Sequence, residues 1–389
     1  MEQREVLYEL DSKKELPAEA INTLRGFFSG CSINFLIGAG FSCSVLKPLG
    51  NTEAILEALG EYSCASFDEK KKVDIVTAHI YEQFFNGSIK PILECCDFFN
   101  ARFKAYHDFA HVLGELLSKR SNPTLGRQMN IFTTNYDPIL ELTLERNRTL
   151  FYNDGFVGRI MPEFSTSNYA ISYYRHAIFS DRKSEMPSVN LYKLHGSLTW
   201  RVETDGTIRY ENYVRSISDF ATRTISSKNV SDAIKAADPT HIETLLTNKD
   251  VEKLTPDHSL FVDYISEYQG RFFIVNPTKG KFASTVMNKT YHDLLRIFSN
   301  EMEKENSLLI AFGFSFRDEH LCDLISRSLM NPSLKLIIMC FNKQEQINIS
   351  SRIYSSANAI TYIYPSDAGE TIQLQELYDI LRLILWGKK

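Results

Sequence analysis

Glycine, asparagine, histidine and serine stand together in four short segments that lie far apart in the chain. Each segment begins where a run of β-branched and apolar residues stops. The segments are Gly38-Ala39-Gly40-Phe41-Ser42, Thr133-Thr134-Asn135-Tyr136-Asp137, Lys193-Leu194-His195-Gly196-Ser197 and Gly313-Phe314-Ser315. In an open α/β sheet, ligands bind in the crevice beyond the carboxyl ends of the strands. Four strand ends of this composition therefore predict one shared binding site.

The first segment follows a strand directly, and we expect it to open a helix. Glycine permits a tight turn and a close approach of the backbone to a phosphate, and free N–H groups at a helix start attract anions. The common dinucleotide fingerprint requires a third glycine or an alanine, but Cys43 stands in that position. A plain strand-to-helix turn is an equally good interpretation of this segment alone. Ser42 then either binds a phosphate or caps the helix.

The second segment combines an amide with a carboxylate. Asn135 offers both a donor and an acceptor at a strand end, where it could hold a ribose hydroxyl or an attacking water. Asp137 is also well placed to cap a helix that has Pro138 in its first position. That structural interpretation would account for Asp137 without any ligand.

The third and fourth segments add a titratable group and a second glycine turn. His195 ends an apolar strand, and a histidine suits general-base chemistry near neutral pH, although a single histidine is more often structural. Gly196 would let another segment or a ligand come close. Gly313 and Ser315 could contact a phosphate or a ribose. Asp318 has capping-box spacing from Ser315, which favours a structural cap.

The composition is that of an ordinary soluble globular protein, with 43% hydrophobic and 23% charged residues in a chain of 389. A net charge of -5 gives no electrostatic footprint for nucleic acid. No apolar run approaches the roughly 20 residues of a membrane span, and the charged N-terminus does not suit a targeting sequence. Seven cysteines without a C-x-x-C pair indicate a reducing cytoplasm and argue against a four-cysteine zinc site. We therefore expect a cytoplasmic protein without a metal.

Strands that alternate with helices predict an α/β fold with a mainly parallel, doubly wound sheet. The predicted strands are 33–37, 129–134, 189–194, 271–275, 308–314, 334–341 and 360–364, and the predicted helices include 18–28, 52–59, 138–145, a helix around 291–304, and 374–386. A mostly helical elaboration is expected at about 60–128. An irregular insert with a hairpin turn at Asp205-Gly206 is expected at about 200–270. Both belong to a single domain over residues 1–389.

The four segments, in this order, resemble the nucleotide site of the sirtuin family, and the likeness covers most of the chain outside 60–128 and 200–270. In that family the Gly-Ala-Gly turn holds the diphosphate of NAD, and the Gly-x-Ser segment borders the adenosine. The resemblance implies that Asn135 lies at the nicotinamide ribose and that His195 is the catalytic base. It implies NAD contacts for Gly38, Ala39, Gly40, Phe41, Ser42, Thr134, Asp137, Gly313, Phe314 and Ser315.

Two departures separate the chain from protein deacylases. It lacks their zinc-binding cysteines, and residues 41–48 read Phe-Ser-Cys-Ser-Val-Leu-Lys-Pro where those enzymes carry an arginine-bearing loop. The pattern looks more like the bacterial sirtuin-like NADases of anti-phage defence. Residues 275–279, 291–304 and 312–320 look especially like the member encoded beside a HerA-type ATPase.

The resemblance thus implies an NAD glycohydrolase that releases nicotinamide and ADP-ribose and depletes NAD during abortive infection. NAD would be its substrate, a HerA-type ATPase or helicase its partner, and a homo-oligomer its assembly. Two alternatives stay open. One is NAD-dependent deacylation or ADP-ribosyl transfer, and the other is a non-catalytic NAD-binding assembly subunit. The sequence contains no G-x-S-x-G, P-loop lysine or H-E-x-x-H motif.

Overall fold

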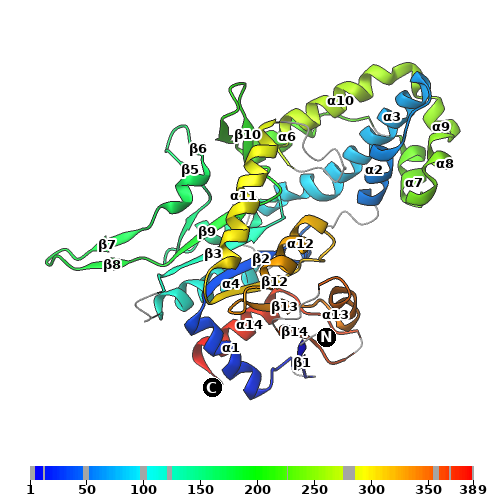
Figure 1. Cartoon of the computed structure of the whole chain (residues 1–389). Helices are drawn as coiled ribbons and strands as arrows, with labels where there is room; N and C mark the ends of the chain where they lie inside the picture. The colour runs from blue at the N-terminus through cyan, green and yellow to red at the C-terminus, as the bar shows by residue number, and fades with distance from the viewer. Residues whose placement is uncertain are drawn as a thin grey trace. The chain divides into compact units, whose positions relative to one another are not determined.

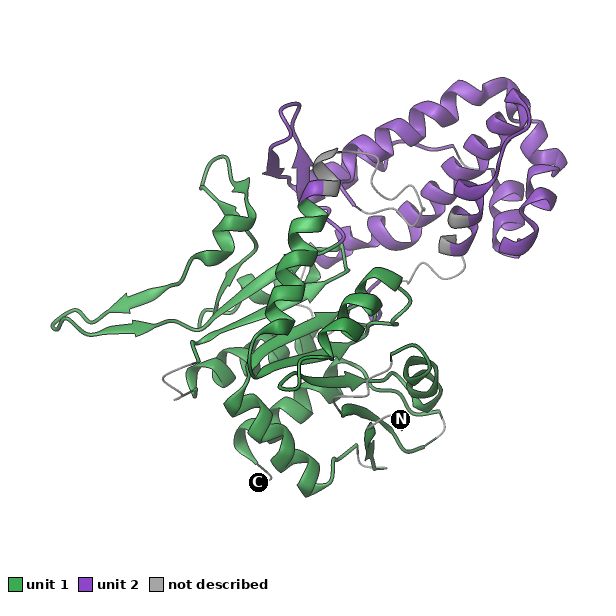
Figure 2. Cartoon of the chain, viewed as in Figure 1, with its two compact units in different colours: residues 1–41, 98–194, 290–389 green, residues 42–97, 195–289 purple. Residues whose placement is uncertain are grey.

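The structure is a computed structural model, and its chain divides into two compact units (Figure 2). Unit 1 comprises residues 1–41, 98–194 and 290–389, and unit 2 comprises residues 42–97 and 195–289. The residues described are 5–11, 14–46, 52–96, 103–120, 125–225, 227–274, 285–353, 359–367 and 369–387. Within these ranges, no helix has the length and apolar character to cross a membrane.

Unit 1 is built on an eight-stranded sheet in which every neighbouring pair of strands is parallel (Figure 1). The strand order is β1-β14-β13-β12-β2-β3-β9-β4. The strands are β1 (Glu5–Leu10), β2 (Ser32–Ile37), β3 (Gln128–Thr133), β4 (Phe151–Asn153), β9 (Ser188–Lys193), β12 (Ser307–Phe312), β13 (Lys335–Met339) and β14 (Ile360–Pro365). The predicted α/β fold with a mainly parallel sheet is confirmed.

Helices cover both faces of this sheet, which explains why its central strands are buried along nearly their whole length. Phe35 packs against Phe109 of α4 (Lys104–Ser118), with ring centroids 6.1 Å apart. Phe132 is the register partner of Leu36 and therefore points to the opposite face. There it packs against Phe298 of α11 (Thr285–Glu303), at 5.0 Å. The other helices of unit 1 are α1 (Ala18–Gly30), α5 (Ile139–Glu145), α12 (Glu319–Ser328), α13 (Lys343–Ser350) and α14 (Leu374–Trp386).

The order of the strands reverses between β2 and β12. From β2 the chain continues outward through β3 and β9, whereas β12 lies on the other side of β2 and is followed outward by β13 and β14. Such a reversal is a topological switch point, and its carboxyl edge is where open α/β sheets bind ligands. The sheet therefore places the four motif-bearing strands β12, β2, β3 and β9 side by side at this edge.

Residues 150–188 of unit 1 carry short strands that the sequence did not predict. They are β4, β5 (Phe156–Val157), β6 (Glu163–Phe164), β7 (Tyr174–His176) and β8 (Lys183–Glu185), with the 3-10 helix η5 (Thr166–Ala170) between β6 and β7. Strands β7 and β8 form a two-stranded antiparallel hairpin that projects from the sheet (Figure 1). The edge strand β1 was also not predicted, because Glu5 and Glu9 interrupt its apolar pattern.

Unit 2 is mostly helical. Its helices are α2 (Thr52–Glu61), α3 (Phe67–Phe84), α6 (Tyr213–Phe220), α7 (Lys228–Ala236), α8 (Ile242–Leu246), α9 (Lys249–Glu252) and α10 (His258–Arg271). It also contains the shorter η2 (Phe85–Ile89), η3 (Lys90–Cys96), η6 (Pro239–His241) and η7 (Thr255–Asp257), and the hairpin of β10 (Trp200–Val202) and β11 (Ile208–Tyr210). Stacking of Tyr81 on Tyr268, with centroids 4.5 Å apart, joins α3 to α10.

The structure differs from one prediction for this part of the chain and agrees with another. The predicted strand 271–275 is wrong for the residues described, because Arg271 ends α10 and Ile274 forms only an isolated bridge to Gly196. The hairpin turn at Asp205-Gly206 is confirmed, with a φ of +84° at Gly206. The insert is also more helical than its weak periodicity suggests.

Candidate functional site

Three glycines close the switch point between β2 and β12. The N–H of Gly38 donates to the carbonyl of Phe312 at 3.0 Å, and the N–H of Gly40 donates to the carbonyl of Gly313 at 2.9 Å. A Cβ atom on Gly38 would lie 2.5 Å from the carbonyl oxygen of Gly313. A Cβ atom on Gly40 would lie 2.5 Å from the Cα atom of Gly313. Gly313 itself has a φ of +63°. Backbone contacts backbone here, so a side chain at any of these positions would force the two loops apart.

The second and third segments are fastened to the same edge. The hydroxyl of Thr133 donates to the carbonyl of Ile37 at 2.8 Å, and the N–H of Thr134 donates to the same carbonyl at 3.2 Å. The amide nitrogen of Asn135 donates to the carbonyl of Gly38 at 3.0 Å. The N–H of Leu194 donates to the carbonyl of Thr133 at 2.8 Å. The ends of four adjacent strands are thus joined by hydrogen bonds.

A buried ion pair fixes the loop that follows β3. The side chain of Lys193, which is 2% exposed, places its Nζ 2.8 Å from Oε2 of Glu141 in α5. The same Nζ donates to the carbonyl oxygens of Asn135, at 3.2 Å, and Asp137. Burial raises the pKa of Glu141 to about 7, although the nearby Lys193 lowers it in part. Lys193 and Glu141 therefore hold the backbone on both sides of Tyr136.

Sequence reasoning gave neither member of this pair a role. The available signal was a lysine at the end of the otherwise uncharged strand β9, all six residues of which are buried. A lysine is almost never fully buried without a partner. Lys193 therefore predicted a carboxylate nearby, but the sequence alone could not identify it as Glu141.

The structure gives Phe41 a packing role. Its ring is buried and meets the rings of Tyr106 and Phe109 edge to face, at centroid distances of 5.1 and 5.5 Å. Its carbonyl accepts a hydrogen bond from the Tyr106 hydroxyl at 2.8 Å, and its N–H donates to the carbonyl of Gly38 at 3.0 Å. These contacts account for Phe41 without the predicted contact to NAD.

The glycine turn also differs from its predicted geometry. We expected a helix with free N–H groups after Gly38, but one turn of 3-10 helix, η1 (Ala39–Phe41), stands there. The N–H groups of Gly38, Gly40 and Phe41 all donate to carbonyls of the chain. Ala39 is the exposed residue of this turn, so a ligand can reach the turn there. Ser42 is buried and is the first residue of unit 2.

Each of the two aspartates of the motifs accepts a hydrogen bond at the start of a helix. Asp137 accepts a hydrogen bond from the N–H of Ile139 at 3.0 Å, at the start of α5. The expected N-cap position is wrong by one residue, because Pro138 rather than Asp137 is the N-cap. Asp318 accepts from the N–H of Leu321 at 3.1 Å and is itself the N-cap of α12.

The remaining part of the fourth segment lies at the surface of unit 1. Ser315 is exposed, and its carbonyl accepts a hydrogen bond from Arg352 at 2.9 Å. Phe314 is half-buried, and its ring lies 4.9 Å from that of Phe316. Ser315 is therefore open to a ligand, whereas Phe314 is partly engaged in packing.

His195 directly follows Leu194 and begins unit 2, where its side chain is half-buried. Gly196 has a φ of +77°, and a Cβ atom on it would lie 2.3 Å from the carbonyl oxygen of Phe273. The N–H of Ser197 donates to that same oxygen at 3.1 Å. The close approach that we expected at Gly196 is thus made by the chain's own segment at Phe273.

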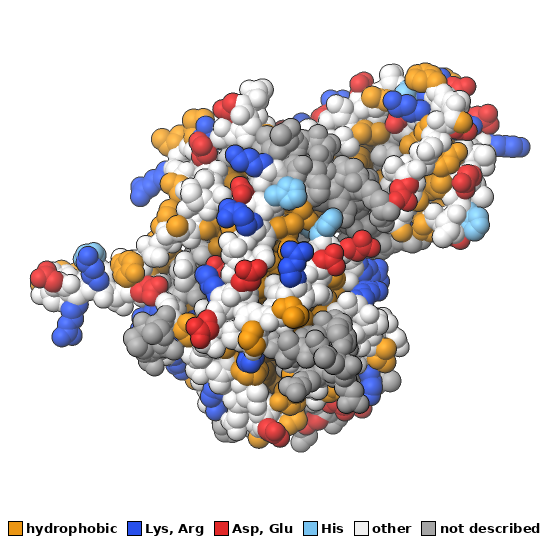
Figure 3. Space-filling model, viewed as in Figure 1, with side chains coloured by type: hydrophobic (Ala, Val, Ile, Leu, Met, Phe, Trp, Pro, Cys, Tyr) orange, Lys and Arg blue, Asp and Glu red, His pale blue; other side chains and the backbone are white. Residues whose placement is uncertain are grey.

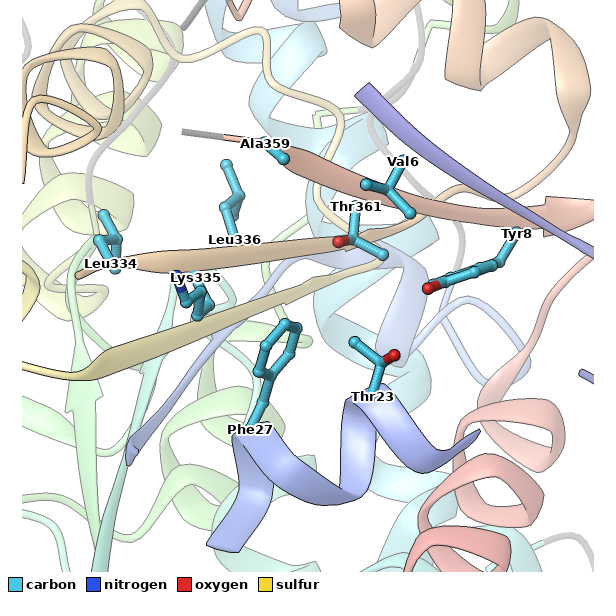
Figure 4. A pocket seen from close by; sticks show the side chains of 9 residues that line it. All are labelled: Val6, Tyr8, Thr23, Phe27, Leu334, Lys335, Leu336, Ala359 and Thr361. Carbon is cyan, nitrogen blue, oxygen red and sulfur yellow. The ribbon is translucent and has the colours of Figure 1, made fainter. Parts of the chain in front are cut away.

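One small cavity of unit 1 lies away from these segments (Figure 4). It has a volume of about 130 Å³ and is bounded by α1 and the amino-terminal ends of β13 and β14. The candidate site is at the carboxyl ends of the strands, so this cavity is at the other edge of the sheet. Its lining is mostly apolar apart from Lys335 and a few hydroxyl groups. Over the described ranges, no cluster of His, Cys, Asp and Glu could hold a metal ion.

We predict that Gly313→Ala destabilises the protein by about 2 kcal/mol or more, because alanine disfavours a positive φ and its Cβ would strike Gly40. Gly26→Ala is the matched control. Gly26 lies inside α1, and a Cβ atom added there would meet no described atom within 4 Å, so alanine should stabilise by about 0.5–1 kcal/mol. Urea unfolding followed by circular dichroism measures both changes. Similar effects of the two substitutions would contradict the role of the glycine contact.

We also predict a pH-dependent effect of Glu141→Gln. Because the folded-state pKa of Glu141, about 7, exceeds its ordinary value of 4.5, the folded state binds this proton more tightly than the unfolded state. The free energy of unfolding of the wild type, relative to the variant, should therefore fall by about 2–3 kcal/mol as the pH rises through this window. Urea titrations of both proteins at several pH values measure the difference. If this difference in the free energy of unfolding grew with pH, the attraction of Lys193 would affect the pKa of Glu141 more than burial does.

Comparison with known protein families gives one match. The SIR2-like domain family matches residues 129–251, a range that contains Lys193 and both candidate catalytic residues, Asn135 and His195. A search of curated proteins found no match. The match spans less than half of the chain, and together with the parallel α/β sheet it supports a likeness to the SIR2-like family, whose members use NAD.

Proposed function

We propose that the protein is an NAD glycohydrolase, which cleaves NAD into nicotinamide and ADP-ribose. The observation that carries the proposal is the meeting of the ends of β12, β2, β3 and β9 at the switch point, where an open α/β sheet binds its ligand. The SIR2-like match over the second and third segments supports NAD as that ligand.

The residues at this edge fit a dinucleotide only in part. Ala39 and Ser315 are exposed on the two loops that the glycines hold together, and they are the proposed contacts for the diphosphate and the adenosine. Asn135 is buried and fixed to Gly38, so it is held rigidly for the proposed positioning of a ribose or a water. Most N–H groups of the first turn already donate hydrogen bonds within the chain. The turn would therefore bind NAD through the shape of its surface more than through hydrogen-bond donors.

The proposed reaction breaks the bond between the nicotinamide nitrogen and C1′ of the ribose. The bonding electrons leave with nicotinamide, and the oxygen of a water bonds to C1′. His195 takes a proton either from that water or from a ribose hydroxyl, and in the second case the water returns a proton to that hydroxyl. The transition state resembles an oxocarbenium ion, so orientation of the sugar and water contributes more than a strong nucleophile. A rigid strand-end loop is well suited to that task.

Deacylation is the main rival within the same family. It requires a peptide groove, and the sequence lacks the C-x-x-C pairs of the zinc module that supports the small domain of deacylases. NAD incubated with a labelled acyl-lysine peptide separates the two reactions. Transfer of the acyl group would overturn the hydrolase proposal, whereas nicotinamide release independent of the peptide would support it.

We further propose that the protein acts in anti-phage defence together with a HerA-type ATPase. The proposal rests on the sequence likeness at 291–304 and 312–320. The first stretch covers most of α11 and the residue after it, and the second runs from the last residue of β12 to the start of α12. The third stretch of that likeness, 275–279, lies outside the described residues. Depletion of NAD in the cytoplasm would be the means of defence.

A homo-oligomer is part of the same proposal, and the projecting hairpin is its proposed contact. Ile178 and Phe179 at the hairpin tip are 89% and 97% exposed. Strands β7 and β8 pair only with each other within the described residues, so each has an open edge that could pair with the hairpin of a second copy. Figure 3 shows charged side chains of both signs along the hairpin, which suits contact between two identical arms.

We predict that His195→Ala lowers the rate of nicotinamide release by roughly 10²–10⁴-fold if His195 is the base. His320→Ala is the matched control, because His320 is an exposed histidine on α12. The measurement is nicotinamide released from NAD per folded molecule, with folding checked by circular dichroism. An unchanged rate for His195→Ala would remove the base assignment.

We predict that the double variant Ile178→Asp, Phe179→Asp sediments as a smaller species than the wild type, because charges at the tip would oppose its burial between copies. The control is Met330→Asp, at an exposed apolar residue elsewhere in unit 1. Sedimentation velocity measures the mass of each protein. The same mass for all three proteins would place the oligomer contact elsewhere.

A further inference from the structure

A second cavity of unit 1 lies at the amino-terminal ends of β2, β3 and β9, and its volume is about 300 Å³. Ser32 and Gln128 are the first residues of β2 and β3, so this cavity is at the edge of the sheet remote from the carboxyl-end loops. The helix α11, which covers this face, contributes Glu301 near its end, and Lys304 follows.

The cavity contains a buried cation, Arg120, which is only 8% exposed. Among the described residues, the hydrogen bonds of its guanidinium go to backbone carbonyls and not to a carboxylate. It donates to the carbonyls of Phe28 at 3.3 Å, Gly126 at 3.4 Å and Cys31. Its Nε, although buried, has no hydrogen-bond partner in the described part of the chain. Burial lowers the pKa of Arg120.

The other charged groups at the cavity neutralise one another. Lys304 donates to both carboxylate oxygens of Glu301, at 2.6 and 2.7 Å. Arg120 therefore leaves the cavity with an excess of positive charge. A buried guanidinium is a strong, planar donor for carboxylate and phosphate groups, and it is costly when left unpaired.

One wall of the cavity is a ladder of amides that crosses the sheet. The amide of Asn130 donates to Asn34 at 2.8 Å, that of Asn190 donates to Asn130 at 3.1 Å, and that of Gln128 lies 3.4 Å from the oxygen of Asn190. Asn130, Asn190 and Gln128 line the cavity. Amides offer donors and acceptors together, which is the chemistry that recognises hydroxyl groups.

We propose that this cavity is a second binding site, which takes a small hydroxylated molecule carrying a phosphate or a carboxylate. The oxyanion would pair with Arg120, and the hydroxyl groups would face the amide wall. The volume is at the lower end for ligand pockets, which fits a molecule the size of a sugar phosphate or sugar acid. This site is independent of the proposed NAD hydrolysis.

Isothermal titration of the full chain with three probes tests the proposal. Ribose 5-phosphate carries a phosphate, gluconate carries a carboxylate, and ribose is uncharged. We expect at least one of the two anions to bind and ribose to bind at least about tenfold more weakly, since charge-assisted hydrogen bonds supply the difference. Absence of binding by both anions, or equal binding by ribose, would overturn the proposal.

Variants locate the binding. Arg120→Gln should weaken binding of the anion at least about tenfold. Ser32→Leu keeps the guanidinium but fills the cavity, so it should abolish binding even if Arg120→Gln fails to fold. Lys335→Gln is the control, because it removes a cation from the other cavity. Wild-type affinity in either folded cavity variant would exclude this cavity as the site.

Discussion

The contact of three glycines at the switch point is the constraint on which the rest of the site depends. Gly38 and Gly40 follow β2, and Gly313 follows β12. The two loops that contain these glycines contact each other through backbone atoms. Because β2 and β12 are neighbours in the sheet but distant in sequence, this contact joins two loops that lie far apart in the chain. The glycines are thus explained by packing between loops. Any role in holding a diphosphate is secondary to that packing and follows from the surface that the packed loops create.

The loop after β3 is fixed to these glycines by side chains. Asn135 holds the carbonyl of Gly38, and Lys193 holds the carbonyls on both sides of Tyr136 while pairing with Glu141. A buried ion pair is weak evidence for stability, because desolvation opposes the attraction. The ion pair acts here by fixing the position of the loop that carries Asn135, since removal of either partner would leave a buried charge beside that loop. The loop that carries Asn135 is therefore held by several side-chain contacts within unit 1, which suits a reaction limited by orientation.

Much of this arrangement could be predicted from the sequence, and the exceptions have physical causes. The buried strands of a parallel sheet are continuous apolar runs, so their ends, and the motifs that follow them, are visible in the sequence. The strand β1 has an edge position and mixed polarity, and the hairpin of β7 and β8 lacks a buried face, so neither carries that signal. The helices from α6 to α9 are short and begin at capping side chains such as Asn212 and Asn248, which weakens their periodicity. The partners of Lys193 and Arg120 are set by tertiary structure, which spacing along the chain does not encode.

The most direct test of the account is the fate of NAD in the presence of the purified wild-type chain. NAD labelled in its nicotinamide ring is incubated with the chain alone and with a HerA-type ATPase, and free nicotinamide and ADP-ribose are separated by chromatography. The account predicts equal amounts of the two products in at least one of these settings. Intact NAD in both settings, with the chain folded, would contradict it and would favour a non-catalytic NAD-binding subunit.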